Sequence, residues 1–236
     1  MDWQTLISFG DQGWGDEIAR GVFITVTLAL ATLPLGLLIG FFIALAKQSE
    51  ERTLRIAADV YTTIFRGLPE LLTLFIVFYG MQIGIQNALR ALGFETGIEI
   101  NAFAAGMVAL ALVFSSYASE VFMSAFKAIP KGQYEGGHAL GLSDGQTMRT
   151  IIAPQLIRIA LPGLANLWMI LLKDTALVSA IGLSDIVRQT GIAARVTKEA
   201  FLFYGIAFIL FLVLALLSSI VINRIEAYGE RSEAVR

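Results

Sequence analysis

The chain has 236 residues, of which 56% are hydrophobic and only 15% are charged, and its mean hydropathy is +0.73. A soluble domain carries about a quarter charged residues, so this composition indicates an integral membrane protein. The net charge of −2 argues against a nucleic-acid partner, and the absence of cysteine excludes disulfides, thiolate catalysis and zinc–thiolate sites. Because there is also only one histidine, we expect no metal site in this chain.

Five apolar segments are long enough to cross a bilayer, because a hydrocarbon core of about 30 Å needs roughly 20 helical residues. They lie at about 21–46, 70–89, 100–122, 158–182 and 200–223. The first contains Gly36 and Gly40, a G-x-x-x-G pattern that favours close helix packing. The fourth is interrupted by Lys173 and Asp174. No internal repeat or linker divides the chain, so we predict an all-α integral membrane protein with a single transmembrane domain over 1–236.

The distribution of Lys and Arg predicts the orientation, because these residues are enriched in cytoplasmic loops. The segments 47–70, 126–158 and 224–236 together carry 11 of them, whereas the segments 1–20, 85–99 and 173–199 carry 6. Five spans place the two termini on opposite sides of the membrane. We therefore expect the N-terminus outside and the C-terminus inside.

Two further segments have the spacing of amphipathic helices. Residues 49–65 place apolar side chains at helical intervals among Arg52, Arg55 and Asp59. This pattern predicts a helix that lies along the cytoplasmic interface or extends the next span. Residues 185–199 have the same character on the outer side.

The cytoplasmic segment at about 127–154 contains signals for two short helices. Residues 131–140 are polar with a few apolar positions, and Gly141 is suited to a helix end or turn. Ser143 can cap a second helix, and Pro154 is expected to stop that helix before the next span. These signals predict a helix-turn-helix that presents charge to a soluble partner, although an ordinary structured loop fits them equally well.

A motif in this segment is more specific. Glu135, Gly141, Ile151 and Pro154 have the spacing E-x5-G-x9-I-x2-P, which resembles the coupling-loop signature of ABC importer permeases. Further matches to these permeases are RGLPE at 66–70, AIPKGQ at 128–133 and LKDTALVS at 172–179. Together they look like the permeases of polar amino-acid ABC importers, in particular the arginine and histidine/lysine/arginine/ornithine permeases and their opine-transporting relatives. The resemblance covers roughly residues 18–226.

The resemblance implies a type I ABC importer fold in a bacterial inner membrane. It implies a coupling loop at about 127–154, in which Glu135, Gly141, Ile151 and Pro154 contact a separate ABC ATPase dimer. The implied partners are that ATPase dimer, a second permease subunit, a periplasmic substrate-binding protein, the amino-acid substrate and membrane lipid. ATP and magnesium would be held by the ATPase, so no cofactor and no enzymatic activity are expected in this chain.

The chain also departs from the family pattern. Gly136 and Gly137 replace two alanines, and each glycine costs about 1 kcal/mol of helix propensity relative to alanine. This change predicts a looser first coupling helix, or one that a partner holds in place. Ala153 replaces the leucine before the proline of the motif, and Met123 and Ser124 stand where relatives often have Arg-Gly.

The charges within the spans are the candidates for a substrate path, because such charges are costly unless they are paired or face a cavity. Lys173 and Asp174 lie about 15 residues into the fourth span, where a broken helix often forms a substrate site. In one interpretation, Asp174 meets a substrate cation and Lys173 a carboxylate. In the other, the two residues form structural ion pairs with Glu120 or Glu70.

Glu120 lies towards the cytoplasmic end of the third span, in the polar stretch 115–120 that includes Tyr117. It either lines the exit of the path or forms a structural ion pair. Glu70 follows Pro69 four residues after Arg66, which is consistent with a local salt bridge, a gate or an anchor at the cytoplasmic boundary.

Catalytic signatures are missing from the sequence. There is no G-x-x-x-x-G-K-[ST] phosphate loop, no H-E-x-x-H and no G-x-S-x-G. The alternative to an importer permease is a secondary transporter or channel that uses Glu120 and Asp174 as ion sites. Such proteins usually show internal repeats, which this sequence lacks.

Overall fold

The computed structural model describes residues 3–10, 13–93 and 99–231, with side chains described as far as residue 227, and the described chain is entirely helical. Its elements are α1 (Trp3–Leu6), α2 (Gly15–Gln48), α3 (Arg52–Gly67), α4 (Glu70–Ala91), α5 (Ala102–Ala128), α6 (Lys131–Ala139), α7 (Asp144–Thr147), the π-helical turn η1 (Met148–Ile152), α8 (Ala153–Asp174), the 3-10 helix η2 (Thr175–Ile181), α9 (Ile186–Thr197) and α10 (Ala200–Arg231).

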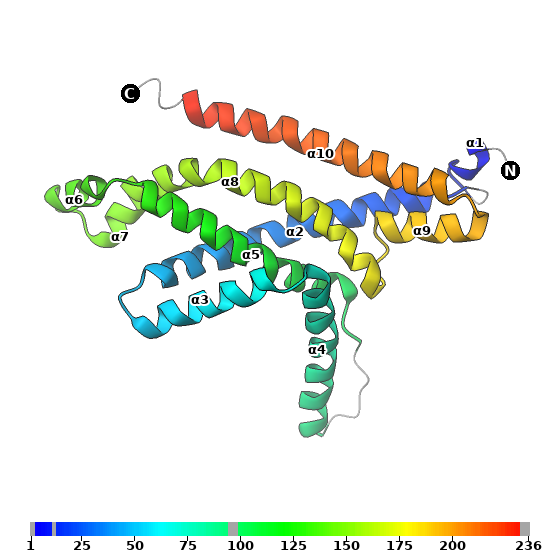
Figure 1. Ribbon diagram of the computed structural model, residues 1–236, viewed down its shortest axis with the longest axis horizontal. Helices are drawn as coiled ribbons and strands as arrows, with labels where there is room; N and C mark the ends of the chain where they lie inside the picture. The colour runs from blue at the N-terminus through cyan, green and yellow to red at the C-terminus, as the bar shows by residue number, and fades with distance from the viewer. Residues whose placement is uncertain (1–2, 11–12, 94–98, 232–236) are drawn as a thin grey trace.

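Five helical stretches in the described residues are long and apolar enough to cross a membrane, as the sequence predicts. They are Gly15–Gln48, Glu70–Ala91, Ala102–Ala128, the continuous stretch Asp144–Ile181 and Ala200–Ala227. Figure 1 shows α2, α5, α8 and α10 running along the long axis of the molecule, with α6 and α7 at one end and α1 and α9 at the other.

The centre of the bundle is the packing of α2 against α5. Gly36 lies against the ring of Phe114, and Gly40 lies against Ala118 and the backbone carbonyl of Ser115. A Cβ atom on Gly40 would be only 2.9 Å from the Cβ of Ala118. The G-x-x-x-G pattern therefore marks a close helix contact, as expected from the sequence.

Helix α3 differs from one of the two sequence expectations for residues 49–65. It folds back along α2 and packs on α2 and α5, and so does not extend the next helix (Figure 1). The hydroxyl of Tyr61 is 3.0 Å from the carbonyl oxygen of Leu112 and 2.8 Å from Ser115 Oγ on α5. Ala58 and Thr62 are buried on the same face. The apolar side chains of Leu54, Ile56, Val60 and Ile64 remain about half exposed, so the amphipathic pattern describes the outer face of α3 and not the face that packs on the bundle.

Helices α4 and α10 are only partly covered by the rest of the chain. Figure 1 shows α4 projecting away from the bundle, and in α4 only Thr73 and Leu74 are buried. In α10, burial is confined to Phe203 and Ala207 near its start among the described side chains.

The chain from α7 to η2 is continuous, which corrects the expected role of Pro154. This proline is the second residue of α8 and does not stop the short second helix. The π-helical turn η1 joins α7 to α8, and proline is tolerated in a first helical turn because its missing N–H would be unpaired there. At the other end, α8 changes at Asp174 into the 3-10 helix η2, so the fourth span changes its helical geometry, without a gap, where the sequence indicated.

Candidate functional site

Helices α6 and α7 form a helix-turn-helix at one end of the molecule (Figure 1). Glu135 is exposed in the middle of α6. Gly141 lies between the two helices with φ of 77°, a left-handed conformation that glycine adopts without strain. Leu140 beside it is 78% exposed, so the turn presents an apolar side chain at the surface.

Side-chain contacts fix the angle between the two short helices. Ser143 caps α7 in a reciprocal capping box with Gln146, as its position in the sequence predicts. His138 Nε2 of α6 lies 2.8 Å from Asp144 Oδ1 of α7, and both side chains are exposed. The histidine therefore bridges the two helices at their open edge.

The structure explains one of the two glycines that depart from the family pattern, Gly137. It is buried against Thr147, and a Cβ atom there would lie 2.5 Å from Thr147 Cγ2. A Cβ on Gly136 would meet no atom within 4 Å. Only Gly137 is thus required by the close approach of α6 to α7.

The other two motif residues join this unit to the bundle. Ile151 in η1 is half-buried against the main hydrophobic core, whereas Pro154 is exposed at the start of α8. Gln155 Nε2 of α8 donates to Gln133 Oε1 of α6 at 3.1 Å. Helices α6 and α8 are therefore in direct contact through these side chains.

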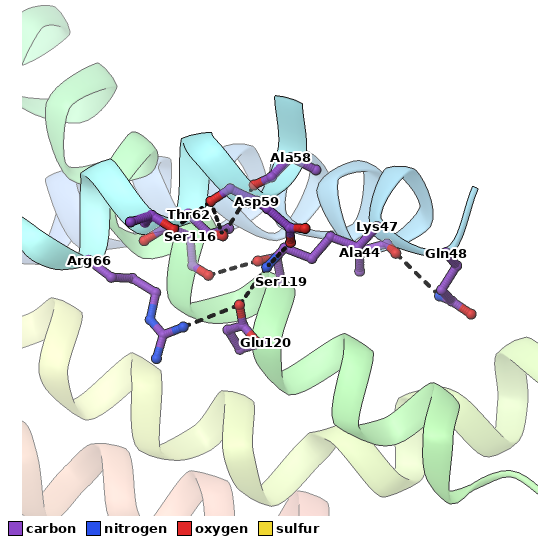
Figure 2. Close-up of polar contacts among 11 residues, drawn as sticks. Ala44, Lys47, Gln48, Ala58, Asp59, Thr62, Arg66, Ser116, Ser119 and Glu120 are labelled. Carbon is purple, nitrogen blue, oxygen red and sulfur yellow. Dashed lines mark hydrogen bonds and ion pairs between the residues drawn. The ribbon is translucent and has the colours of Figure 1, made fainter. Parts of the chain in front are cut away.

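A second group of candidates forms a network of four charges between α2, α3 and α5 (Figure 2). Lys47 Nζ donates to Glu120 Oε1 at 2.6 Å and lies 3.4 Å from Asp59 Oδ1. Arg66 Nη1 lies 3.2 Å from the same oxygen of Glu120. The guanidinium of Arg66 also stacks over the ring of Tyr117, with its Cζ 5.6 Å from the ring centre.

This network resolves several of the alternatives that the sequence leaves open. The ion-pair partners of Glu120 are Lys47 and Arg66, not Lys173. Among the described residues Arg66 pairs with Glu120 and not with Glu70, so the local salt bridge is not formed, whereas the gate and the boundary anchor stay predictions. A hollow of about 350 Å³ also opens beside Glu120, between α5 and α8, and Ser124 and Gly163 contribute to its lining.

Sequence reasoning missed Lys47 and Asp59. Lys47 stands in the last turn of α2, where a basic residue is ordinary, and its side chain is only 10% exposed. In the sequence pattern Asp59 is simply one of the polar residues of the amphipathic segment. The available signal is the position of Lys47 in the last turn of a 34-residue helix, five residues before another helix begins.

The third group lies where α8 changes to the 3-10 helix η2. Asp174 is the last residue of α8, and Glu70 is the first residue of α4, which packs against η2. The charges of Glu70 and of Lys173, the sequence neighbour of Asp174, both act on the carboxylate of Asp174. Among the described residues, no cation lies within 4 Å of Asp174 or Glu70, so the structural ion pairs proposed for them are not formed.

The sequence candidates thus form three separate sets along the molecule. Glu135, Gly141, Ile151 and Pro154 belong to the helix-turn-helix and its junction. Glu120 and Tyr117 both contact Arg66. The third set, Glu70, Asp174 and Lys173, lies near the change from α8 to η2.

Residues 33–227 match the family of binding-protein-dependent transport system inner membrane components. The chain belongs to this family. It is 40% identical to the nopaline transport system permease protein NocQ of Agrobacterium fabrum, with 96% of this chain and 97% of the relative covered. It is 38% identical to the histidine/lysine/arginine/ornithine permease HisQ of Salmonella typhimurium, with 91% and 93% covered. It is 36% identical to the arginine permease ArtQ of Escherichia coli, with 92% and 96% covered.

Solved structures agree with this assignment. An amino acid ABC transporter crystallised with histidines superimposes with a TM-score of 0.76 at 32% identity, over 91% of this chain and 95% of that one. The inward-facing methionine transporter MetNI superimposes with a TM-score of 0.74 at 18% identity, over 90% and 96%, a likeness of fold. The fold is therefore that of type I ABC importer permeases, and the chain is a multi-pass inner-membrane permease of an ABC importer.

Proposed function

We propose that this chain is the permease subunit of an importer that carries a cationic amino acid, or a related opine, into the cell. The observation that carries the proposal is that Glu70 and Asp174 lie near each other at the end of α8, with no cation within 4 Å of either among the described residues. Two carboxylates at this depth are costly unless a positive group joins them. The relatives named for histidine, lysine, arginine, ornithine and nopaline transport support the same class of substrate.

In this proposal the substrate's side-chain cation lies between Glu70 and Asp174. Lys173 is exposed beside them and carries the charge that a substrate carboxylate needs. The first turn of α4, which begins at Glu70, adds unpaired backbone N–H groups at the same place. Such ends of broken helices are common substrate ligands in transporters.

The test compares substrates of different charge on the same transporter. Asp174→Asn keeps the shape of the side chain and removes its charge, so uptake of arginine or lysine is expected to fall on the order of tenfold, the effect of about 1.4 kcal/mol. Uptake of a neutral analogue such as citrulline is expected to fall less. Equal uptake of all substrates at normal protein levels contradicts the proposal.

A structural role for Asp174 gives a different result. The variant would then lose folded protein, and neutralising Lys173 as well would restore it. The ratio of uptake to inserted protein separates these two outcomes.

The helix-turn-helix of α6 and α7 is proposed to dock on a separate ATPase that binds ATP and magnesium. Its exposed Glu135, exposed Leu140 and direct link to α8 support this role. In reconstituted transporter, Glu135→Lys is expected to insert normally and to uncouple ATP hydrolysis from uptake. Normal uptake, with normal stimulation of ATPase activity by the loaded binding protein, would show that α6 is not part of the coupling interface.

The proposed assembly also contains a second permease subunit, identical or homologous, and a periplasmic binding protein on the outer side. The uncovered apolar side chains of α4, including Ile76 and Ile83, support a protein neighbour for that helix. Orientation is testable because the chain has no cysteine. A cysteine at exposed Gln4 should react with an impermeant thiol reagent in intact spheroplasts, whereas one at exposed Lys131 should not.

A further inference from the structure

A groove on the side of the bundle lies between α2, α8 and α10, away from the three sets of residues described above. It has a volume of about 470 Å³ and is lined by residues at 26–37, 161–172 and 214–225. Ser218 is the single lining residue with a polar side chain, apart from the indole N–H of Trp168. Leu217 and Val221 on its rim are more than half exposed, so the groove opens outward.

The length of the groove fits one leaflet of a bilayer. The lining residues extend over 11 helical steps of α8 and 11 of α10. At a rise of 1.5 Å per residue this is about 16 Å. The hydrocarbon core is about 30 Å thick, so a complete transmembrane helix of a partner needs a groove about twice as long. An acyl chain that enters from one leaflet needs only this length.

Two basic residues stand at one end of the groove. Arg158 precedes the lining residues Leu161 and Ala165 by three and seven positions, so it continues their face of α8. Arg224 follows Val221 by three positions and continues the lining face of α10. Both guanidinium groups are exposed, and neither has an acidic partner in the described part of the chain.

With the orientation proposed above, this basic end faces the cytoplasm. Basic pockets between transmembrane helices on that side attract anionic lipid headgroups. The distal half of α10 also has no buried side chain in its described part, so protein packing does not fill the space beneath it. Apolar lining, leaflet length and an unpaired basic end together match one kind of molecule.

We infer that this groove is a binding site for an anionic phospholipid of the inner leaflet, with an acyl chain between α8 and α10 and the phosphate at Arg158 and Arg224. The bound lipid holds the distal half of α10 to the bundle. The site is separate from the substrate path, so the inference stands or falls independently of the transported substrate.

Trp168 lines the groove and reports on its occupant. The complete transporter is placed in phosphatidylcholine nanodiscs that contain an increasing fraction of either phosphatidylglycerol or phosphatidylcholine with brominated acyl chains. Bromine quenches tryptophan fluorescence on contact. The signal of Trp168 is taken as the difference between the wild type and the Trp168→Phe variant.

We expect brominated phosphatidylglycerol to quench Trp168 at a concentration on the order of tenfold lower than brominated phosphatidylcholine. The double variant Arg158→Gln/Arg224→Gln should lose this preference. Arg55→Gln, which changes an exposed and unpaired arginine of α3, should keep it. Native mass spectrometry of the detergent-purified complex gives an independent count of retained phosphatidylglycerol in the same variants, without the Trp168→Phe reference.

Three results would overturn the inference. Equal quenching by both lipids means ordinary bilayer contact without a site. Absence of quenching by either lipid means that protein, such as the second permease, covers the groove. A preference that survives in the double arginine variant means that the headgroup is held elsewhere.

Discussion

Lys47 at the end of α2 donates a 2.6 Å hydrogen bond to Glu120 of α5, although 73 residues separate the two in sequence. Asp59 and Arg66 of α3 complete the network on either side. One carboxylate thus joins three helices. The network also explains why α3 folds back on the bundle.

Glu120→Gln is expected to lower the stability of the permease. The change leaves Lys47, which is only 10% exposed, with Asp59 as its single charged partner, and it removes the anion that faces Arg66. We expect a loss of about 1–2 kcal/mol in the free energy of unfolding, measured by thermal unfolding in detergent. Glu50→Gln is the matched control, because Glu50 is exposed and unpaired in the described structure. Identical unfolding of the two variants would mean that the network contributes nothing.

Gly137→Ala should loosen the packing of α6 on α7. The new Cβ would lie 2.5 Å from Thr147 Cγ2, which is too close for either helix to keep its position. Gly136→Ala puts the same methyl group into open space one residue earlier and should be neutral or stabilise α6 by up to about 1 kcal/mol. ATPase stimulation by the loaded binding protein is expected to fall only for the first variant.

Thr147→Ala in the Gly137→Ala background removes the methyl and hydroxyl groups that collide, so it should restore part of the loss. If both single glycine variants behave alike, the close contact between α6 and α7 has no part in coupling.

The membrane spans were predictable because hydropathy and segment length decide them almost alone. The contact of Gly36 and Gly40 with α5, the left-handed Gly141 and the cap formed by Ser143 were also predictable, because each depends on local chemistry. The break at Asp174 followed from placing two charged residues within an apolar run.

The position of α3 and the partners of Glu120 were not predictable. An amphipathic helix has the same pattern against protein as against lipid, and a salt bridge between residues 73 positions apart leaves no local signal. The prediction that Pro154 stops a helix was wrong, because a π-helical turn carries the chain into α8. Such turns have no sequence signature of their own.

Gly40→Ala should weaken the contact between α2 and α5. Its Cβ would lie 2.9 Å from both the Cβ of Ala118 and the carbonyl oxygen of Ser115, and neither atom can move without shifting the helix. We expect a loss of about 1–3 kcal/mol, measured as reduced thermal stability in detergent. Gly84→Ala in α4 meets no atom within 4 Å and serves as the control. Equal stability of the two variants would show that the contact between α2 and α5 accommodates a methyl group at position 40.

Asp185 should make the stability of the permease depend on pH. This residue caps α9 by accepting a 2.9 Å hydrogen bond from the backbone N–H of Arg188, while its other carboxylate oxygen is buried without a partner in the described structure. Burial raises the pKa of Asp185 to about 6, against the opposing effect of the backbone hydrogen bonds and the charge of Arg188. The unfolded chain titrates near its ordinary value of about 3.9.

Between about pH 4 and pH 6 the folded protein therefore binds more protons at Asp185 than the unfolded chain does, so this residue lowers stability as the pH rises through that window. Asp185→Asn keeps the cap and removes the titration. We expect the variant to be more stable than the wild type at pH 7, by on the order of 2 kcal/mol, and the difference to be clearly smaller at pH 4.5. Thermal unfolding of both proteins in detergent at the two pH values measures the difference. A variant that is less stable than the wild type at pH 7 would show that the ionised carboxylate stabilises the fold. The positive charge of Arg188 would then offset the cost of burying that carboxylate.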